Sequence, residues 1–261
     1  MKIQTKEFNK ITLIPSKKRY YPASVNLGRL DKGNYIKHTD IDIPMGKSRY
    51  GGPIADLPTG VRCPKGMYFA GQLDLNEIAR FDTESRLPTS GHLIFFANIR
   101  DECHVVYSDT PNDSLQRVIT EHEEQFWDGV LIEDMKSEVE SMTDCYREPE
   151  EYELDCYECE EDFRTCDCNS EYNEVTLDQV TADGEIWNDF AGAEQSKMFG
   201  FFNHCQWTKK EVEEVVFSDK VVLLQIGEKG FTEAGVFIIL IDKEALKNKD
   251  FSACTYYWSQ S

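Results

Sequence analysis

The feature that most constrains this chain is a pattern that occurs twice. An apolar strand with a single glutamine is followed, after a turn, by a glycine that opens a second apolar strand. The first copy places Gln72 and Gly91 at these two positions, and a weaker copy near the C-terminus places Gln225 and Gly235 there. Self-similarity of this kind predicts an internal duplication of one β-rich unit.

A glutamine inside an apolar strand needs hydrogen-bond partners, because burying an unpaired amide costs about 1–3 kcal/mol. We expect Gln72 to bond a nearby backbone, and the turn Gly51-Gly52-Pro53 is the first candidate. Glycine tolerates positive φ and proline fixes its own φ, so the chain should reverse at this turn. A ligand-binding role for Gln72 stays open as the alternative.

The chain is strongly acidic, with 28 Lys and Arg against 48 Asp and Glu and a formal net charge of −20. This balance argues against general affinity for nucleic acid or for anionic membranes, and it favours a basic partner if there is one. The charge is unevenly spread. Residues 1–50 carry eleven basic against four acidic side chains, whereas residues 144–174 carry two against thirteen.

The sequence contains no run of the roughly 18 apolar residues that a membrane span requires. No apolar signal segment follows Met1. The nine cysteines are an odd number, which fits reduced thiols better than a complete disulfide framework. We therefore expect a cytoplasmic protein.

The acidic stretch holds four closely spaced cysteines, Cys156, Cys159, Cys166 and Cys168. Thiolates arranged as C-x2-C-x6-C-x-C can surround one tetrahedral zinc, so these four are candidate metal ligands. The neighbouring carboxylates oppose this, because they raise thiol pKa values and disfavour the thiolate that zinc needs. A solvated acidic insert with reduced thiols is the alternative.

Catalytic motifs are missing from the sequence. It contains no nucleophile elbow, no phosphate-cradling glycine loop, no His-Glu-x-x-His helix and no Cys/His couple. We therefore predict no catalytic residues and no cofactor apart from the candidate zinc. An enzyme whose site residues are distant in the sequence remains an alternative.

Helices are predicted at four places, one of which is capped by Asp242 and runs through Ala245 and Leu246. Asp74 with Glu77, and Thr208 with Glu211, match capping boxes that open short helices. Residues 134–142 place methionine and valine at helical spacing among acidic residues, which predicts a surface helix with one apolar face.

Two separated blocks of the sequence resemble the YwqG-like family (DUF1963), an uncharacterised bacterial domain family. The first block carries the matching residues Gly51, Gly52, Pro58, Pro64, Phe69, Ala70, Gln72, Leu87, Pro88, Gly91, Leu93, Phe95 and Phe96. The second carries Phe199-Gly200-Phe201, Gln206, Leu223-Leu224-Gln225-Ile226 and the strand from Gly235 to Ile239. Cys63 departs from the pattern, since the family usually has tryptophan there.

The resemblance implies an α+β domain of duplicated, mostly antiparallel β-sheet units with short helices. We expect a single domain over residues 1–261, with units near 45–107 and 198–258 and the acidic cysteine-rich insert near 140–175. The resemblance implies no established chemistry. Some members are thought to accompany secreted bacterial toxins, which implies an immunity-type role.

We therefore expect a cytosolic, non-catalytic binding protein, immunity-like toward a basic protein. An enzyme with an unrecognised site and a zinc-stapled interaction module are the alternatives. The residues predicted to have a structural or ligand-lining role are Gly51, Gly52, Pro53, Gln72, Gln206 and Gln225.

Overall fold

The structure is a computed structural model, and it describes residues 6–25, 34–98, 102–120, 126, 128–145, 194–202, 204, 207, 209–227 and 235–259. Its strands are β1 (Glu7–Tyr21), β2 (Tyr35–Lys37), β3 (Arg49–Tyr50), β4 (Ile54–Leu57), β5 (Tyr68–Asp74), β6 (His92–Ala97), β7 (Cys103–Ser108), β8 (Gln116–Ile119), β9 (Gly129–Ser141), β10 (Lys197–Phe199), β11 (Lys220–Ile226), β12 (Val236–Asp242) and β13 (Thr255–Ser259). Its helices are α1 (Leu75–Ile78), α2 (Met142–Cys145), α4 (Lys209–Val216) and α5 (Lys243–Lys247), with 3-10 turns η1 (Asn112–Ser114) and η4 (Phe251–Ala253).

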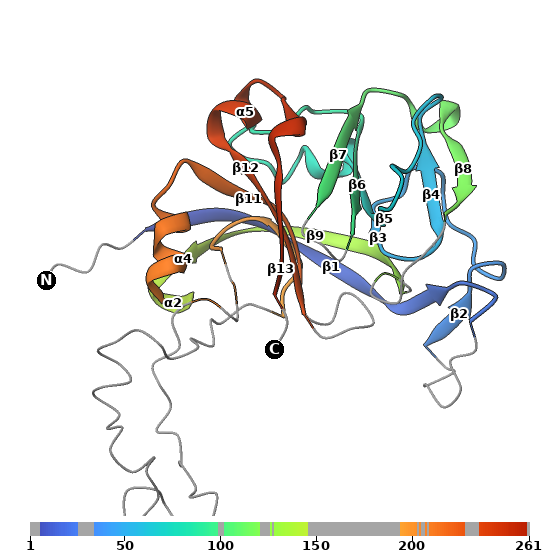
Figure 1. The fold of residues 1–261 in the computed structure, drawn as a ribbon, viewed down its shortest axis with the longest axis horizontal. Helices are drawn as coiled ribbons and strands as arrows, with labels where there is room; N and C mark the ends of the chain where they lie inside the picture. Colours follow the sequence, from blue (N-terminus) through green and yellow to red (C-terminus); the bar gives the residue numbers. More distant parts are fainter. Residues whose placement is uncertain are drawn as a thin grey trace, which may run out of the picture.

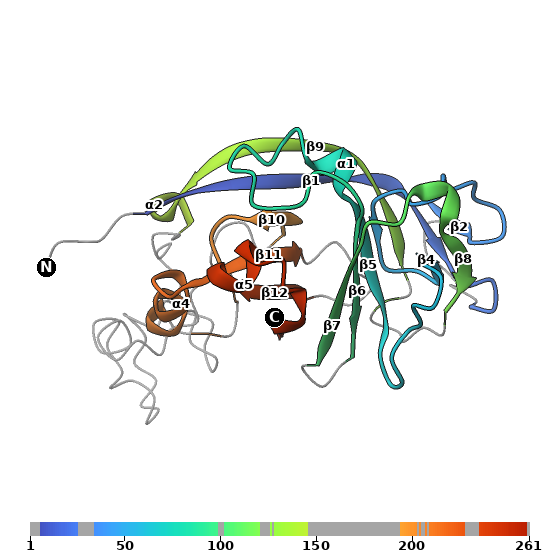
Figure 2. The same ribbon diagram turned by 90° about the horizontal axis from the view of Figure 1, so that it is seen from above.

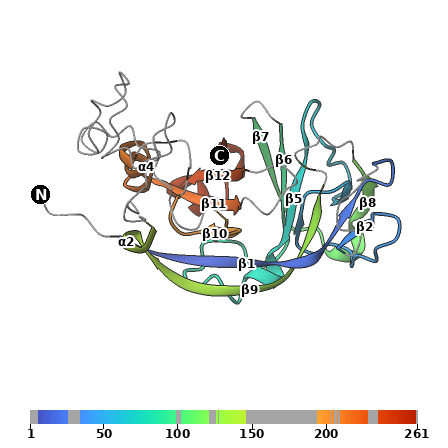
Figure 3. The ribbon, with the colours of Figure 1, turned by 90° about the horizontal axis from the view of Figure 1, so that it is seen from below.

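The two longest strands, β1 and β9, pair antiparallel in the middle of an 11-stranded sheet. The sheet order is β13-β12-β11-β10-β1-β9-β3-β5-β6-β7, with β2 added in parallel beside β1. Figure 1 shows β1 and β9 as long bands that pass both halves of the sheet. In Figures 2 and 3 both halves lie on the same side of these bands, so the sheet is strongly curled.

The two ends of the curled sheet meet through side chains, so the sheet is nearly closed. The ring of Phe251 in η4 lies 5.9 Å from the ring of Tyr107 in β7, measured between centroids. The Cys103 sulfur of β7 lies 3.8 Å from the backbone oxygen of Cys254, just before β13. Closure gives both halves one hydrophobic core, in which Phe95 of β6 and Phe237 of β12 are both fully buried.

Each half of the sheet has a second layer on its outer face. The two-stranded sheet β4–β8 covers β5 and β6, where Leu57 packs in one cluster with Phe96. Helix α4 covers β11 and β12, where Val212 packs with Leu240. Within the described residues, no helix combines the length and the apolar character needed to cross a membrane.

Both strand pairs that the glutamine–glycine pattern predicts are formed, as β5–β6 and β11–β12. In each pair the glutamine lies opposite the third residue after the glycine, Gly91 in one and Gly235 in the other. Each ladder also skips the residue two positions before its glutamine, which is Ala70 or Leu223. Antiparallel pairing dominates the sheet and the helices are short, in agreement with the predicted class.

The helix predicted over residues 134–142 is wrong. These residues continue β9 and pair with β1, and only Met142 begins a helix, α2. A spacing of four residues brings side chains to one face of a strand as well as to one face of a helix. Met135 and Val139 therefore lie on the same face of β9, where Met135 is buried and Val139, farther along the strand, is 64% exposed.

The capping box predicted at Asp74 forms only in part. Asp74 caps α1 by accepting a hydrogen bond from the Asn76 backbone N–H. The return bond from Glu77 is not made, because the Asp74 N–H donates to Ser48 Oγ at 2.9 Å and Glu77 pairs with Lys47.

Gly91 provides a test of how tightly β6 is held against β7. Its φ is +92°, and a Cβ there would lie 2.4 Å from the backbone oxygen of Ser108. Gly66 is the matched control, since its φ is +80° and nothing lies within 4 Å of its Cβ position. We expect Gly66→Ala to cost about 1–2 kcal/mol from backbone strain alone. Gly91→Ala should lower the free energy of unfolding clearly more, because β6 and β7 must also separate. Urea unfolding measures both values, and equal costs would contradict the close approach.

Candidate functional site

The first predicted glutamine lies in a buried charge network. Arg49 in β3 is opposite Gln72 in β5, and both side chains are fully buried. The Arg49 guanidinium donates to the backbone oxygens of Ile54 at 3.1 Å and Lys47 at 2.7 Å, and to Gln72 Oε1 at 3.3 Å. Its Nη2 also lies 2.9 Å from Asp56 Oδ2. The network therefore ties together β3, β4 and β5.

Gln72 bonds a backbone group, although not in the turn that the sequence suggested. Its Oε1 accepts from the backbone N–H of Asp56 at 3.2 Å, in β4 just beyond Pro53. Its Nε2 is buried and has no partner in the described part of the chain.

The turn Gly51-Gly52-Pro53 makes backbone contacts of its own. Gly51 N–H donates to the Ala70 oxygen at 2.9 Å, and Gly52 N–H donates to the Phe126 oxygen at 2.8 Å. Both glycines have positive φ, +64° and +75°, as the reversal requires.

The second glutamine lies beside a second network. Lys197 in β10 is fully buried opposite Gln225 in β11. The Lys197 ammonium lies 3.0 Å from Glu140 Oε2, which also accepts from the Phe201 backbone N–H at 2.7 Å. Lys10 donates to the other oxygen of Glu140 at 3.1 Å. Burial lowers the pKa of Lys197 although Glu140 opposes this. Burial would raise the pKa of Glu140, but Lys197 and its other donors bring it below the usual value.

Corresponding serines join the two networks to the central strands. Ser48 precedes Arg49, and its backbone oxygen accepts from Ile132 N–H in β9 at 3.0 Å. Ser196 precedes Lys197, and its backbone oxygen accepts from Leu13 N–H in β1 at 2.8 Å. Each serine hydroxyl accepts from the backbone N–H two residues after the glutamine of its half. The sequence interpretation missed these Ser-Arg and Ser-Lys pairs. The available signal was that Ser48 and Ser196 each lie four residues before a glycine of positive φ, Gly52 and Gly200.

The remaining predicted residues divide into two groups. Gln225 Nε2 donates to the backbone oxygen of Gln195 at 2.9 Å, so it too holds a backbone group. Gln206 and the four candidate zinc ligands, Cys156, Cys159, Cys166 and Cys168, lie outside the described residues. The zinc site therefore stays a prediction. In the part of the chain that the structure describes, no three His, Cys, Asp or Glu side chains gather as a metal site would require.

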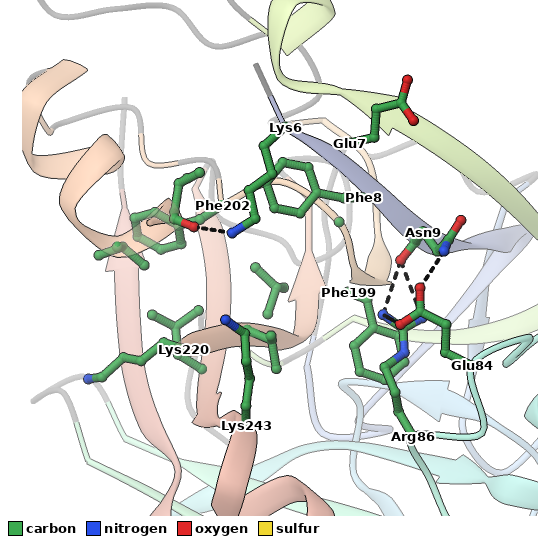
Figure 4. A pocket seen from close by; sticks show the side chains of 16 residues that line it. Lys6, Glu7, Phe8, Asn9, Glu84, Arg86, Phe199, Phe202, Lys220 and Lys243 are labelled. Carbon is green, nitrogen blue, oxygen red and sulfur yellow. Dashed lines mark hydrogen bonds and ion pairs between the residues drawn. The ribbon is translucent and has the colours of Figure 1, made fainter. Parts of the chain in front are cut away.

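A pocket with a volume of about 160 Å³ lies where the start of β1 meets α4 and the ends of β11 and β12 (Figure 4). None of the described glutamines or turn residues predicted from the sequence lines it. Its charged lining consists of Lys6, Glu7, Glu84, Arg86, Lys220 and Lys243. Four of these six side chains are cationic, which is an unusual excess for a chain with a net charge of −20.

Two of the lysines face the same space. Figure 4 shows the ammonium groups of Lys6 and Lys243 turned toward the middle of the pocket and Glu7 directed away from it. Lys6 donates to the Val216 backbone oxygen and lies 5.1 Å from the Phe8 ring centroid. Partial burial, and then the charge of Lys243, lower the pKa of Lys6. Burial and the nearby charge of Lys243 thus both disfavour the protonated form of Lys6.

One wall of the pocket is a strained aromatic residue. Phe199 has a φ of +60°, in the left-handed region that disfavours bulky side chains. The Arg86 guanidinium lies 3.4 Å from the Phe199 ring centroid, and its two terminal nitrogens each lie 3.3 Å from the Asn9 backbone oxygen. Arg86 therefore holds the Phe199 ring against the pocket.

Together these features of the described residues define a nearly closed, mostly antiparallel β-sheet protein that contains the two buried charge networks and the cationic pocket described above. A family model for a domain of unknown function, DUF1963, matches residues 37–259, so the chain belongs to that family. The match confirms the resemblance to DUF1963 stated from the sequence, and its range includes both glutamine–glycine units. A comparison with curated protein sequences finds no match.

Asp56 gives the first network a pH dependence that can be measured. Burial alone would raise the pKa of this carboxyl, but Arg117, which donates at 2.8 and 3.0 Å, and the charge of Arg49 hold it below the usual value. A lowered pKa in the folded state means that ionised Asp56 stabilises the fold above about pH 4. That contribution is lost as the pH falls further, through the pKa of the folded state.

Asp56→Asn should lower the free energy of unfolding at neutral pH by about 3 kcal/mol, because it leaves the buried Arg49 guanidinium without its carboxylate. It should also flatten the dependence of stability on pH below about pH 4. Asp219→Asn is the control, since that side chain is 96% exposed. Denaturant unfolding over a pH series measures both effects. An unchanged acid limb in Asp56→Asn would contradict this role.

Proposed function

We propose that this protein is a non-catalytic, cytosolic binding protein that recognises a basic protein, in the manner of an immunity protein. The observation that carries the proposal is that the buried charged groups are committed to internal contacts. Arg49 donates to two backbone oxygens and one side chain, and Glu140 accepts from two lysines and one backbone N–H. A general acid or base must exchange a proton with its substrate, which groups bonded in this way are poorly placed to do.

The chemistry of the partner follows from charge. A net charge of −20 creates a field that attracts basic proteins and speeds their association. The stretch 144–174, with thirteen acidic and two basic residues, concentrates this charge. Recognition of this kind is screened by salt, because exposed charges are shielded within about 10 Å at roughly 0.1 M ionic strength.

We also propose that the two units near residues 45–107 and 198–258 arose by duplication within one domain. The equal cross-strand register of glutamine and glycine, the skipped residue in each ladder and the paired serine contacts support this. A body built from two similar units can present its binding surface on a rigid frame.

Affinity capture at two salt concentrations tests the proposed partner. The full chain, immobilised and exposed to a lysate of the source cell, should retain a basic protein at about 0.05 M salt and release it at about 0.5 M. Co-expression of this chain should then suppress any toxicity of the captured protein. Replacing the acidic residues between 148 and 162 by their amides should weaken capture, whereas Lys136→Gln, at an exposed site, should not. Capture of no protein, or capture that salt leaves unchanged, would contradict the proposal.

The spacing of the four cysteines favours one alternative, a zinc-stapled interaction module. This alternative predicts one zinc per chain and a lower melting temperature after chelation, because a structural zinc contributes directly to folding. Cys166→Ser should lower the zinc content, and Cys63→Ser, outside the cluster, is its control. Substoichiometric zinc together with unchanged melting after chelation would remove this alternative.

A further inference from the structure

The pocket of Figure 4 plays no part in the proposed recognition of a basic protein, and its chemistry is the opposite. We propose that it binds a small amphipathic monoanion, namely a carboxylate joined to an apolar group about the size of one aromatic ring. The carboxylate lies between Lys6 and Lys243, and the apolar group packs against the aromatic wall.

The first argument is uncompensated charge. Within the described ranges no carboxylate lies at ion-pairing distance from Lys6, whose contacts are the Val216 backbone oxygen and two phenylalanine rings. Lys243 donates to the Ser218 backbone oxygen at 3.2 Å, and the only carboxylate near it in the described residues is Asp219, at 3.7 Å and 96% exposed. Two ammonium groups that repel each other across a partly desolvated space are stabilised together by one anion placed between them.

The second argument is the apolar character of the walls. Eight of the sixteen lining residues are apolar, among them Phe8, Phe199, Phe202 and Leu240. Phe199, Phe202 and Leu240 are buried, so the apolar wall open to a ligand comes from the partly exposed Phe8, Val215 and Val221. An apolar group attached to the anion covers these side chains, which inorganic phosphate or acetate would leave in contact with water. A volume of about 160 Å³ fits one ring, because a cavity of roughly 150 Å³ lined by apolar side chains is known to hold benzene.

The third argument is the conformation of Phe199. A left-handed backbone at a bulky residue costs about 1–2 kcal/mol, and such strain is found at ligand sites where it fixes a side chain in advance. Arg86, which also lines the pocket, holds the ring through its stacking and its bonds to the Asn9 backbone oxygen. A wall fixed before binding reduces the entropy that a small ligand must overcome.

Phenylacetate is a suitable probe because it joins one carboxylate to one ring. Calorimetric titration of the full chain should show that phenylacetate binds at least about tenfold more tightly than phenylacetamide, which lacks the charge, and than acetate, which lacks the ring. Equal binding of phenylacetate and phenylacetamide would overturn the proposal, as would equal binding of acetate or phosphate. Binding only at concentrations of tens of millimolar or above would also overturn it.

The same carboxylate chemistry occurs in a free acid and at the C-terminus of a peptide. A tetrapeptide that ends in phenylalanine with a free carboxylate distinguishes the two sources, with its C-terminal amide as control. Tighter binding of the peptide than of phenylacetate assigns the pocket to a polypeptide end, and weaker binding assigns it to a free acid. Either outcome supports a monoanion as the ligand of the pocket. Failure of both phenylacetate and the tetrapeptide to bind would overturn the proposal.

Two matched variants locate the site. Lys243→Met and Lys6→Met should each weaken phenylacetate binding about tenfold, which corresponds to about 1.4 kcal/mol. Lys247→Met is the control, because Lys247 lies in the same helix, is 76% exposed and does not line the pocket. Lys243→Met should leave salt-dependent protein capture intact, which separates failure of this site from failure of the proposed function. Equal affinity of Lys243→Met and Lys247→Met would overturn the assignment.

Discussion

The long antiparallel ladder between β1 and β9 is the constraint on which the rest of the structure depends. It runs from Glu7 opposite Ser141 to Tyr20 opposite Gly129. One half of the sheet is joined to β1 by the pairing of β1 with β10, and the other half is joined to β9 by the pairing of β9 with β3. At one end a Cβ on Gly129 would lie 2.1 Å from the Tyr20 ring, so only glycine allows the buried ring to lie across the strand. The halves curl toward each other because both continue the same twisted pair.

The two buried networks show how each half is fixed to that ladder. Arg49 and Lys197 each lie beside a central strand, each opposite a glutamine, and each within 3 Å of a buried carboxylate oxygen. A buried ion pair adds little net stability, but the loss of one member is costly because a charge is left without its partner. The networks therefore specify which strands are neighbours more than they stabilise the fold.

The cationic side chains of the pocket are lysine and arginine, like those of the two buried networks, but their surroundings differ. Lys197 is compensated by Glu140, whereas Lys6 is approached by aromatic rings, a backbone oxygen and the charge of Lys243. The difference between the structural lysine and the lysine that we propose to bind a ligand lies in the partner that the fold supplies. Phe199, whose backbone is strained, likewise belongs to the pocket, because it is one of the lining residues.

The sequence by itself determined the features that depend on local pattern. Apolar runs, one bearing a single glutamine and the next opened by a glycine, predicted β5–β6 and β11–β12, because strand formation and turning are properties of a few neighbouring residues. The net charge, the family and the cysteine spacing are likewise properties of the chain itself. Only the tertiary structure decided that residues 134–142 form a strand, since their apolar spacing fits both a helix and a strand and pairing with β1 selected the strand. It also decided that Lys6, Arg86 and Lys243 line one pocket, because residues so far apart in the chain meet only when the sheet curls.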